Sequence, residues 1–445
     1  MLKAISPIDG RYHSKTKELS DFFSEFALIR YRIMVEIEYF LSLANERLQG
    51  MDDYPRNMDD DLRHIYQDFS QKDAEHIKDI ESRTNHDVKA VEYFLKEKLD
   101  EMGLGKYREM VHFGLTSQDV NNTAVPLSIK EAIHTTYLPL LTSLKEKIQE
   151  LSKLWKTVPM LARTHGQPAS PTTAGKELYV FADRLGSQIF QLQQTPFKAK
   201  FGGATGNFNA HSVTYPGVDW IAFGNRFVSH LGLERLNYTT QIDHYDQVAT
   251  LCHNLMRINT ILIDMCRDIW TYISMNYFSQ KVIAHETGSS TMPHKVNPID
   301  FENAEGNLGV ANALFSHLAE KLPISRLQRD LTDSTVLRNI GVPFAHSIIA
   351  FKSLNKGLNK IDLNEAAIRD DLDKNWAVLT EAYQSILRRE GVAEPYELLK
   401  SLSRGKDHID RETLHNFVDR LPVTSQVKDE LKRITPFNYT GLIDL

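Results

Sequence analysis

The sequence predicts an all-α protein whose centre is a bundle of long helices. Apolar residues recur every three or four positions along most of the 445-residue chain, which is the spacing of one helix face. The clearest stretch, 248–272, alternates steps of three and four over about three and a half heptads, as bundled helices do. Prolines bound several other apolar stretches, and proline limits a helix.

The same periodicity predicts long helices, in chain order, at 141–155, 172–194, 248–272, 298–322 and 343–358. Pro139 is expected to bend the first, because its ring removes a backbone donor. The acidic run 59–61 suits either a solvated loop or a helix start. The glycine-rich segment 200–209 could cradle a phosphate, but it lacks GxGxxG spacing and a preceding strand, so a tight turn between helices is favoured.

Three domains are expected: a mostly helical N-terminal domain at 1–110, a central long-helix bundle at 111–360, and a helical C-terminal domain at 361–445. Asn364 and Glu365 suit a fresh helix start and support the second boundary. Helices of more than about twenty residues expose more apolar surface than a monomeric bundle needs, so we expect a homo-oligomer. Alternatively, the terminal domains cover that surface.

Bulk properties exclude some classes of partner. The formal net charge of −6 and the pI near 6.3 argue against nucleic acid or an anionic membrane. No apolar run reaches the length of a membrane span, and the N-terminus lacks a signal peptide's apolar core. Cys252 and Cys266 lie about 21 Å apart along one expected helix, too far for a disulfide, and no Cys/His cluster has zinc spacing. We therefore expect a reduced, soluble, cytoplasmic protein.

The densest group of polar side chains lies in the run Gly-Ser-Ser-Thr-Met-Pro-His-Lys-Val-Asn-Pro at 288–298. It combines two serine hydroxyls, the cation of Lys295 and the amide of Asn297. Asn297 suits a helix N-cap and Pro298 the first helical position, with acidic side chains such as Glu302 in the first turn. A loop joined to a helix N-terminus can hold and attack an anion, whereas loops that only connect helices rarely carry so many polar groups.

Four other short segments share this polar character: 84–87, 112–119, 163–169 and 326–334. Each alone is a weak signal, because a histidine such as His165 is more often a cap or a surface residue. Asparagine and aspartate are common turn formers, and exposed arginine–aspartate pairs contribute little energy. Their joint occurrence favours an active site.

The run from Ser289 to Glu302 fills every fixed position of SSxMPxKxNxxxxE, and the chain thereby resembles the fumarase/aspartase superfamily. Segments 6–12, 84–94 and 328–339 resemble the branch that cleaves succinylated nucleotides, over essentially the whole chain. The resemblance implies a three-domain, all-α fold that assembles into a homotetramer, with each site built from three subunits. It also implies small-molecule nucleotide substrates, with no metal, cofactor, nucleic acid or membrane.

The reaction that the resemblance implies is elimination of fumarate from a succinylated nitrogen. Ser289 would be the base that removes a proton beside a carboxylate, and His165 the acid that protonates the departing nitrogen. Serine is a poor base, so Lys295 and the loop amides would support its alkoxide. Glu302 would orient His165 and stabilise its protonated form.

Substrate contacts follow from the same resemblance. Candidates for the succinyl carboxylates are Thr116, Ser117, Ser290, Lys295 and Asn297. Candidates for the nucleotide phosphate, which suits the forked donors of arginine, are Arg11, Tyr12, Arg329, Ser334 and Arg338. The remaining implied contacts are Asn85, His86, Asp87 and Gln241. His86 could also assist proton transfer, but binding is the favoured role.

Two alternatives remain open at this stage. One is another fumarate-releasing lyase of the superfamily, acting on argininosuccinate, aspartate or malate, which would not need Arg11, Arg329, Ser334 and Arg338. The other is a helical scaffold protein that keeps the fold without activity. The joint presence of Ser289, His165, Lys295 and Glu302 argues against that second alternative.

Overall fold

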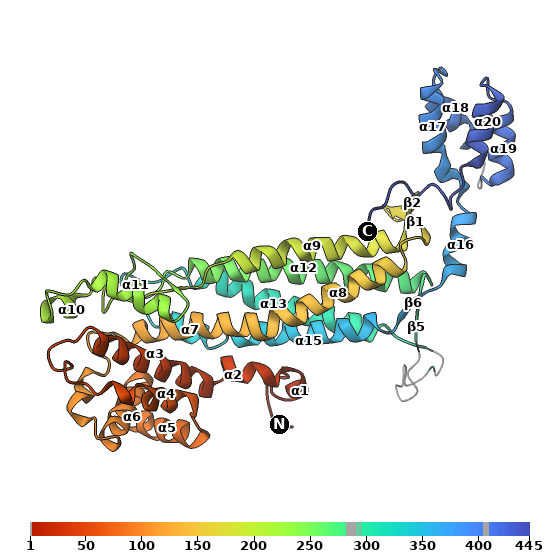
Figure 1. Ribbon diagram of the computed structural model, residues 1–445. Helices are drawn as coiled ribbons and strands as arrows, with labels where there is room; N and C mark the ends of the chain where they lie inside the picture. Colours follow the sequence, from red (N-terminus) through yellow and green to blue (C-terminus); the bar gives the residue numbers. More distant parts are fainter. Residues whose placement is uncertain (1, 282–291, 293–294, 404–408) are drawn as a thin grey trace. The chain divides into compact units, whose positions relative to one another are not determined.

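The computed structural model describes residues 2–281, 292, 295–403 and 409–445, and Figure 1 labels its elements. Helices dominate the described chain, whose strands form only three two-stranded sheets, so the all-α prediction is confirmed. Contacts divide the chain into a first unit (1–141, 188–260 and 307–352) and a second unit (142–187, 261–306 and 353–445). Every boundary between them falls inside a long helix, and the three domains expected from the sequence stay a prediction.

The first unit is organised around α3 (Glu25–Asn45), which α4, α6 and α7 contact. Apolar residues of α3 are buried, and so are its charged residues Arg32, Glu36 and Glu38, as expected for a helix covered on most sides. The other elements of this unit are α1 (His13–Thr16), α2 (Ser20–Phe23), α4 (Asp59–Gln67), α5 (Gln71–Thr84), α6 (Asp87–Glu101), α7 (Ser117–Ala132), β3 (Lys198–Ala199), α10 (Asn209–Thr214), α11 (Trp220–His230), β4 (Glu234–Arg235) and α14 (Thr332–Leu337). The acidic run 59–61 therefore begins a helix.

All five predicted long helices are present: α8 (Leu138–Leu154), α9 (Ala174–Gln194), α12 (Asp246–Ser274), α13 (Ile299–Lys321) and α15 (Gly341–Leu358). A π-helical segment, Ile133–Tyr137, joins α7 to α8 just before Pro139. A π turn holds one residue more than an α turn, and proline offers no backbone donor. The bend expected at Pro139 stays a prediction.

The second unit contains a hairpin that the periodicity does not predict, formed by β1 (Pro159–Thr164) and β2 (Gln167–Thr173). Thr164 pairs with Gln167, so His165 and Gly166 form a two-residue turn, with φ of 53° and 74°. Positive φ at both positions is typical of the turns that connect hairpin strands. Because β2 reaches Thr173, α9 begins two residues later than the helix predicted from residue 172.

The rest of the second unit comprises β5 (Phe278–Gln280), β6 (Ile361–Leu363), α16 (Glu365–Asp373), α17 (Thr380–Arg389), α18 (Pro395–Ser403), α19 (Arg411–Asp419) and α20 (Ser425–Arg433). Asn364 caps α16 by accepting a hydrogen bond from the Ala367 amide at 3.3 Å, so the predicted helix start is confirmed. Helices α17–α20 bury an apolar cluster of their own, which includes Tyr383 and Leu414.

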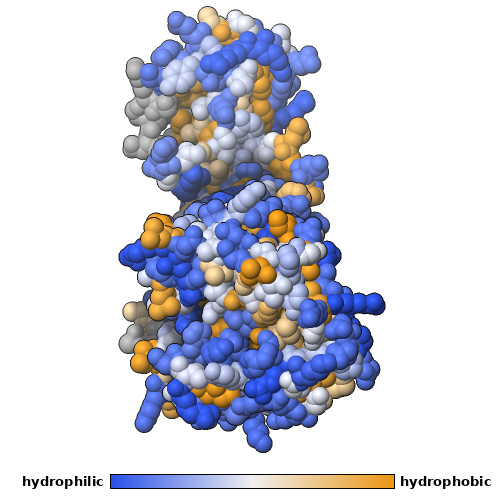
Figure 2. All heavy atoms as spheres, turned by 90° about the vertical axis from the view of Figure 1, so that its left-hand side faces the viewer, coloured by the Kyte–Doolittle hydropathy of each residue, from blue (hydrophilic) through white to orange (hydrophobic). Residues whose placement is uncertain are grey.

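The face shown in Figure 2 is mainly hydrophilic, and apolar side chains appear on it as separate groups. None of the helices in the described ranges has both the length and the apolar character needed to cross a membrane.

His211 lies fully buried in the aromatic core of the first unit, against Tyr39 and Trp220. The Tyr39 hydroxyl donates to the Phe113 carbonyl at 2.7 Å and lies 2.9 Å from Nε2 of His211. The only proton of the Tyr39 hydroxyl is engaged in the bond to Phe113. Nε2 of His211 must therefore carry a proton and donate it to the tyrosine oxygen. Nδ1 is buried with no hydrogen-bond partner in the described chain, so protonating it is unfavourable. Burial lowers the pKa of His211 to about 4.

This histidine predicts a loss of stability in mild acid. Between pH 6.5 and pH 4, His211 is protonated in the unfolded chain but neutral in the folded chain. The free energy of unfolding therefore falls as the pH falls through this range. The loss amounts to about 3 kcal/mol at the acid end of that range. Urea unfolding should show that the free energy of unfolding of the wild type exceeds that of His211→Gln at pH 7, and that this difference becomes smaller as the pH is lowered to 4. A constant difference would contradict this account.

Candidate active site

The glycine-rich segment holds an anion that belongs to the protein itself. The carboxylate of Asp119 is fully buried and accepts hydrogen bonds from the backbone amides of Gly202 and Gly203 at 2.9–3.1 Å. Nζ of Lys200, also fully buried, donates to Asp119 at 2.7 Å and to the Gly203 carbonyl at 2.6 Å. The turn predicted at 200–209 is confirmed, and the anion in its cradle is Asp119.

Asp119 also fixes the beginning of α7. Its Oδ2 accepts from the Thr116 amide at 2.8 Å, while the Thr116 side chain accepts from the Asp119 amide, which together form a capping box. Burial lowers the pKa of Lys200, opposed by the neighbouring Asp119 charge. The cradle thus holds Thr116 and Ser117, both predicted substrate contacts, at one defined helix start.

A second buried network connects α7 with α14. Asp333 accepts hydrogen bonds from the Tyr245 hydroxyl at 2.9 Å and from Nε2 of Gln118 at 3.3 Å. The same Gln118 nitrogen lies 3.3 Å from Oγ of Ser334. Asn122 donates to the Tyr245 hydroxyl at 2.7 Å, and Asn122, Tyr245 and Asp333 are all buried. Ser334 is therefore held in position by a chain of buried, hydrogen-bonded side chains that includes Gln118 and Asp333.

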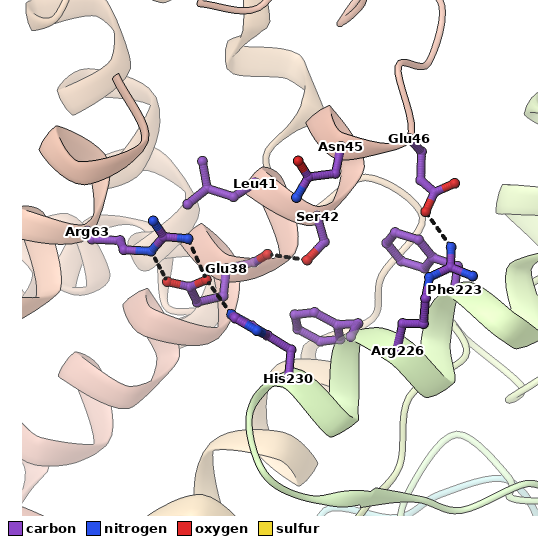
Figure 3. Close-up of a pocket in the computed structure, with 10 residues that line it drawn as sticks. Glu38, Leu41, Ser42, Asn45, Glu46, Arg63, Phe223, Arg226 and His230 are labelled. Carbon is purple, nitrogen blue, oxygen red and sulfur yellow. Dashed lines mark hydrogen bonds and ion pairs between the residues drawn. The ribbon is translucent and has the colours of Figure 1, made fainter. Parts of the chain in front are cut away.

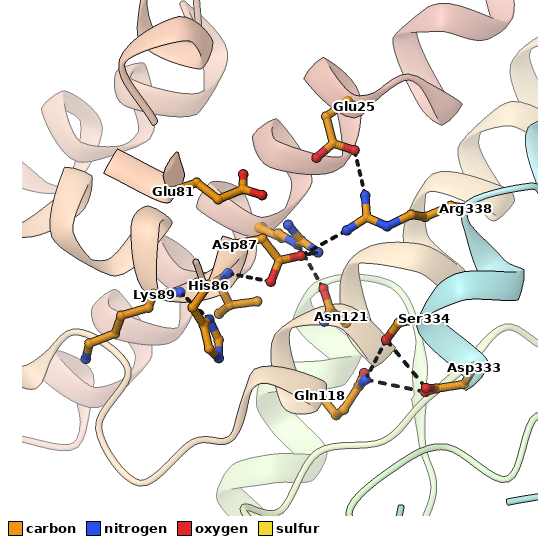
Figure 4. Close-up of polar contacts among 12 residues, drawn as sticks. Glu25, Glu81, His86, Asp87, Lys89, Gln118, Asn121, Asp333, Ser334 and Arg338 are labelled. Atoms are coloured by element: carbon orange, nitrogen blue, oxygen red, sulfur yellow. Dashed lines mark hydrogen bonds and ion pairs between the residues drawn. The ribbon is translucent and has the colours of Figure 1, made fainter. Parts of the chain in front are cut away.

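These helix ends surround a pocket of about 590 Å³ in the first unit. Seven of the residues predicted from the sequence line it: Asn85, His86, Asp87, Ser117, Arg329, Ser334 and Arg338. They come from the junction of α5 and α6, the start of α7, and α14 with its flanks, and Figure 4 shows Arg338 reaching from α14 toward Asp87. Segments far apart in the sequence thus converge on one pocket.

Backbone geometry explains how the α5–α6 junction presents its side chains. Asn85 ends α5 in the left-handed conformation, with φ 53°, which asparagine tolerates better than most residues. His86 is the N-cap of α6, and its Nδ1 accepts from the Lys89 amide at 3.1 Å. Asp87 is the first helical residue, where the helix dipole favours a carboxylate.

Asp87 lies between two arginines. Its Oδ2 accepts from Nη2 of Arg32 at 2.7 Å and from Nη2 of Arg338 at 3.1 Å, and its Oδ1 accepts from the Val88 amide. Burial raises the pKa of Asp87, but the charge of Arg32, the Val88 amide and Arg338 outweigh it and hold the pKa below its ordinary value. Asp87 is thus an anion at neutral pH.

Sequence reasoning missed several side chains of this pocket. Arg32 is buried and also donates through Nε to Asn121 at 2.8 Å, while its Nη1 is buried without a hydrogen-bond partner in the described chain. Arg32, Asn121 and Gln118 all line the pocket. The sequence gives little signal for Arg32, because Arg30, Glu36 and Glu38 also interrupt the apolar residues of this helix.

Some predicted residues of the first unit lie outside this pocket lining. Arg11 is exposed and lies beside the ring of Tyr12, in the segment before α1. Gln241 is partly buried in the loop before α12, and Thr116 is partly buried at the capping box. Their predicted contacts with substrate stay predictions.

The second unit carries the remaining predicted residues. His165 is exposed at the tip of the β1–β2 hairpin, and the hairpin is held by Arg163, whose Nη2 donates to Asp371 at 2.6 Å. Glu302 accepts a hydrogen bond from the Trp270 indole at 3.1 Å. Lys295 and Asn297 lie just before α13. Ser289 and Ser290 lie outside the described residues.

A second pocket in the first unit, of about 230 Å³, is smaller than the first, and none of the residues predicted from the sequence lines it (Figure 3). Its charged side chains pair with one another. Glu38 accepts from Nε of Arg63 at 2.9 Å and lies 3.2 Å from Nε2 of His230, and Arg226 pairs with Glu46. In the described ranges, no group of three His, Cys, Asp or Glu side chains could hold a metal ion.

Comparison with protein families matches the chain over most of its length. Residues 10–312 match the family described as Lyase, and residues 325–440 match the family described as Adenylosuccinate lyase C-terminal. The pocket residues before and after position 312 are thus divided between the two matched regions.

Several relatives are similar over nearly the whole chain. The adenylosuccinate lyase of Dictyostelium discoideum is 59% identical, over 99% of this chain and 97% of that protein. The adenylosuccinate lyases of Legionella pneumophila (strain Corby) and Escherichia coli (strain K12) are 51% and 48% identical, with the same coverage of both chains.

Among solved structures, the fold is similar to that of 3-carboxy-cis,cis-muconate lactonizing enzyme from Pseudomonas putida. The TM-score is 0.76 at 19% identity, over 96% of this chain and 94% of that one. At this identity the likeness concerns the fold alone.

The buried cradle predicts unequal effects of two neighbouring lysine substitutions. Lys200→Met leaves the Asp119 carboxylate buried without its cation and should lower the free energy of unfolding by about 3–5 kcal/mol. Lys198→Met, two residues earlier, removes only a partly exposed pair with Glu234 at 3.7 Å and should change it by less than about 1 kcal/mol. Urea unfolding of both variants measures the difference. Equal losses of unfolding free energy in the two variants would show that burial of the Asp119–Lys200 pair does not increase the cost of breaking it.

Proposed function

The chain belongs to the adenylosuccinate lyase family, and on that basis we propose that it releases fumarate from adenylosuccinate to give AMP. The same elimination converts succinylaminoimidazole-carboxamide ribotide (SAICAR) to AICAR. The observation that carries the proposal is the pocket of the first unit, where Arg329, Ser334 and Arg338 face Asn85, His86 and Asp87. Two arginines and a hydroxyl on one side suit a phosphate, and polar groups on the other suit a ribose or a base.

The proposed chemistry is a β-elimination. Ser289 removes a proton from the carbon beside a succinyl carboxylate, the carbon–nitrogen bond breaks, and His165 protonates the departing nitrogen. Lys295 and the backbone amides near it stabilise the serine alkoxide, and Glu302 orients His165. The exposed position of His165 on a two-residue turn supports this assignment, since the imidazole is free to meet a substrate.

The substrate is divided among three groups of residues in this proposal. The phosphate binds Arg11, Tyr12, Arg329, Ser334 and Arg338. The succinyl carboxylates bind Thr116, Ser117, Ser290, Lys295 and Asn297. The remaining contacts are Asn85, His86, Asp87 and Gln241. No metal or cofactor takes part in this scheme.

We also propose a homotetramer whose subunits share their active sites. Large apolar side chains are exposed on three long helices, namely Phe190 on α9, Trp270 on α12 and Val310 on α13, and burial against another subunit would remove them from water. The cytoplasm is the proposed location, supported by two buried free thiols, Cys252 and Cys266. Nucleic acid and membranes are not proposed as partners.

The substrate assignment predicts which compound yields fumarate. The purified protein should release fumarate, followed by its ultraviolet absorbance, from adenylosuccinate and SAICAR but not from argininosuccinate. The reason is that argininosuccinate offers no phosphate to Arg329, Ser334 and Arg338. Release from argininosuccinate with none from adenylosuccinate would overturn the assignment.

The catalytic assignments predict variants that bind without turning over. Ser289→Ala and His165→Ala should each lower kcat by at least about a hundredfold, because each removes a proton-transfer group. Dissociation constants for adenylosuccinate, measured by calorimetry, should change little. Ser279→Ala, at an exposed serine of β5, is the control and should keep wild-type turnover. Near-normal kcat in either test variant would remove that residue from its role.

A further inference from the structure

Arg338, the arginine assigned to the phosphate, is already paired with two carboxylates. Its Nη1 donates to Oε2 of Glu25 at 2.7 Å, and its Nη2 donates to Oδ2 of Asp87 at 3.1 Å (Figure 4). Glu25 lies at the start of α3, 313 residues away in sequence, and lines the same pocket. A phosphate that approaches Arg338 therefore meets an anion already in place.

The two carboxylates are held very differently. Asp87 has two contacts that do not involve Arg338: the ion pair with Arg32 at 2.7 Å and the hydrogen bond from the Val88 amide at 2.9 Å. Glu25 has, besides Arg338, only the longer contact of 3.5 Å with Lys78 among its side-chain ion pairs in the described chain. About 41% of the Glu25 side chain is exposed, against 26% for Asp87. Glu25 is thus the carboxylate that a ligand can displace.

Charge decides which ligands can displace it. A carboxylate or another single negative charge offers Arg338 no more than Glu25 already does, so the exchange brings little gain. A phosphate dianion brings a second charge and three acceptor oxygens, which suit the fork of a guanidinium. Ser334 and Arg329 lie on the same side of the pocket, with Nη2 of Arg329 3.4 Å from Oγ of Ser334, ready to share that charge.

We propose that Glu25 is an internal counter-ion that occupies Arg338 until a phosphate dianion displaces it, and that it thereby sets the affinity of the pocket for phosphate ligands. The assignment rests on the proposed function, because it takes Arg338 as the phosphate-binding arginine. In this role Glu25 weakens binding of every anion that must displace it. Among these anions a phosphate dianion gains most in exchange, because it can contact Arg338, Arg329 and Ser334 together.

The test compares two glutamines placed in the same pocket. Glu25→Gln removes the counter-ion, whereas Glu81→Gln removes an equal charge from the same lining, where Glu81 pairs with Lys78 at 2.6 Å. Calorimetry with AMP, inorganic phosphate and adenosine measures binding without turnover. Because exposed ion pairs are weak, we expect Glu25→Gln to lower the dissociation constants of AMP and phosphate roughly three- to fivefold. The dissociation constant of adenosine, which carries no phosphate, should not change. Glu81→Gln should tighten none of them by as much.

A second background shows whether the effect passes through Arg338. In Arg338→Gln, the further change Glu25→Gln should leave AMP affinity unchanged. Weaker AMP binding in Glu25→Gln, equal tightening in Glu81→Gln, or a full effect without Arg338 would each overturn the proposal. These readings do not depend on the reaction: a wild type that binds AMP but releases no fumarate from adenylosuccinate would refute the proposed function and leave this comparison valid.

Discussion

The pocket depends on one buried charge pair, Asp119 with Lys200. The Asp119 carboxylate accepts from the Lys200 ammonium, from the Gly202 and Gly203 amides and from the Thr116 amide, so two separated segments, 116–119 and 200–203, are held at one point. Gly203, at φ 80°, has a conformation that few other residues adopt. A buried pair of this kind adds little net stability, but breaking it leaves an unpaired charge in the interior. Its effect is therefore to specify where α7 begins, and with it the edge of the pocket.

From that fixed edge, the pocket is built of helix ends and alternating charges. Helix termini offer unpaired backbone groups and short polar side chains, and α5, α6, α7 and α14 all contribute theirs. Across them the charges alternate from Arg32 through Asp87 and Arg338 to Glu25. Arg32, at one end of this series, is buried and held in place. Glu25, at the other end, is exposed, so a ligand can displace it.

The long helices and the polar segments could be predicted because both leave local patterns. A seam such as that of α12 repeats over many residues, and Asn85, His86 and Asp87 form a dense polar cluster. Arg32 and Asp333 could not be assigned, because a single charged residue in a helix reveals its role only when its partner, from a distant segment, is known. The β1–β2 hairpin was missed because its strands do not alternate apolar and polar residues, and they contain three prolines, which are uncommon in strands.

The π-helical turn at 133–137 has a consequence for how this chain can evolve. Each residue of an α-helix adds about 100° of rotation, so the extra residue of a π turn shifts the whole of α8 around its axis. Losing one residue there would restore regular winding and turn the buried stripe of Leu141, Leu144, Ile148 and Leu151 away from its neighbours. Length in this segment is thus more constrained than residue identity, and homologues with the same packing should show substitutions there rather than gaps.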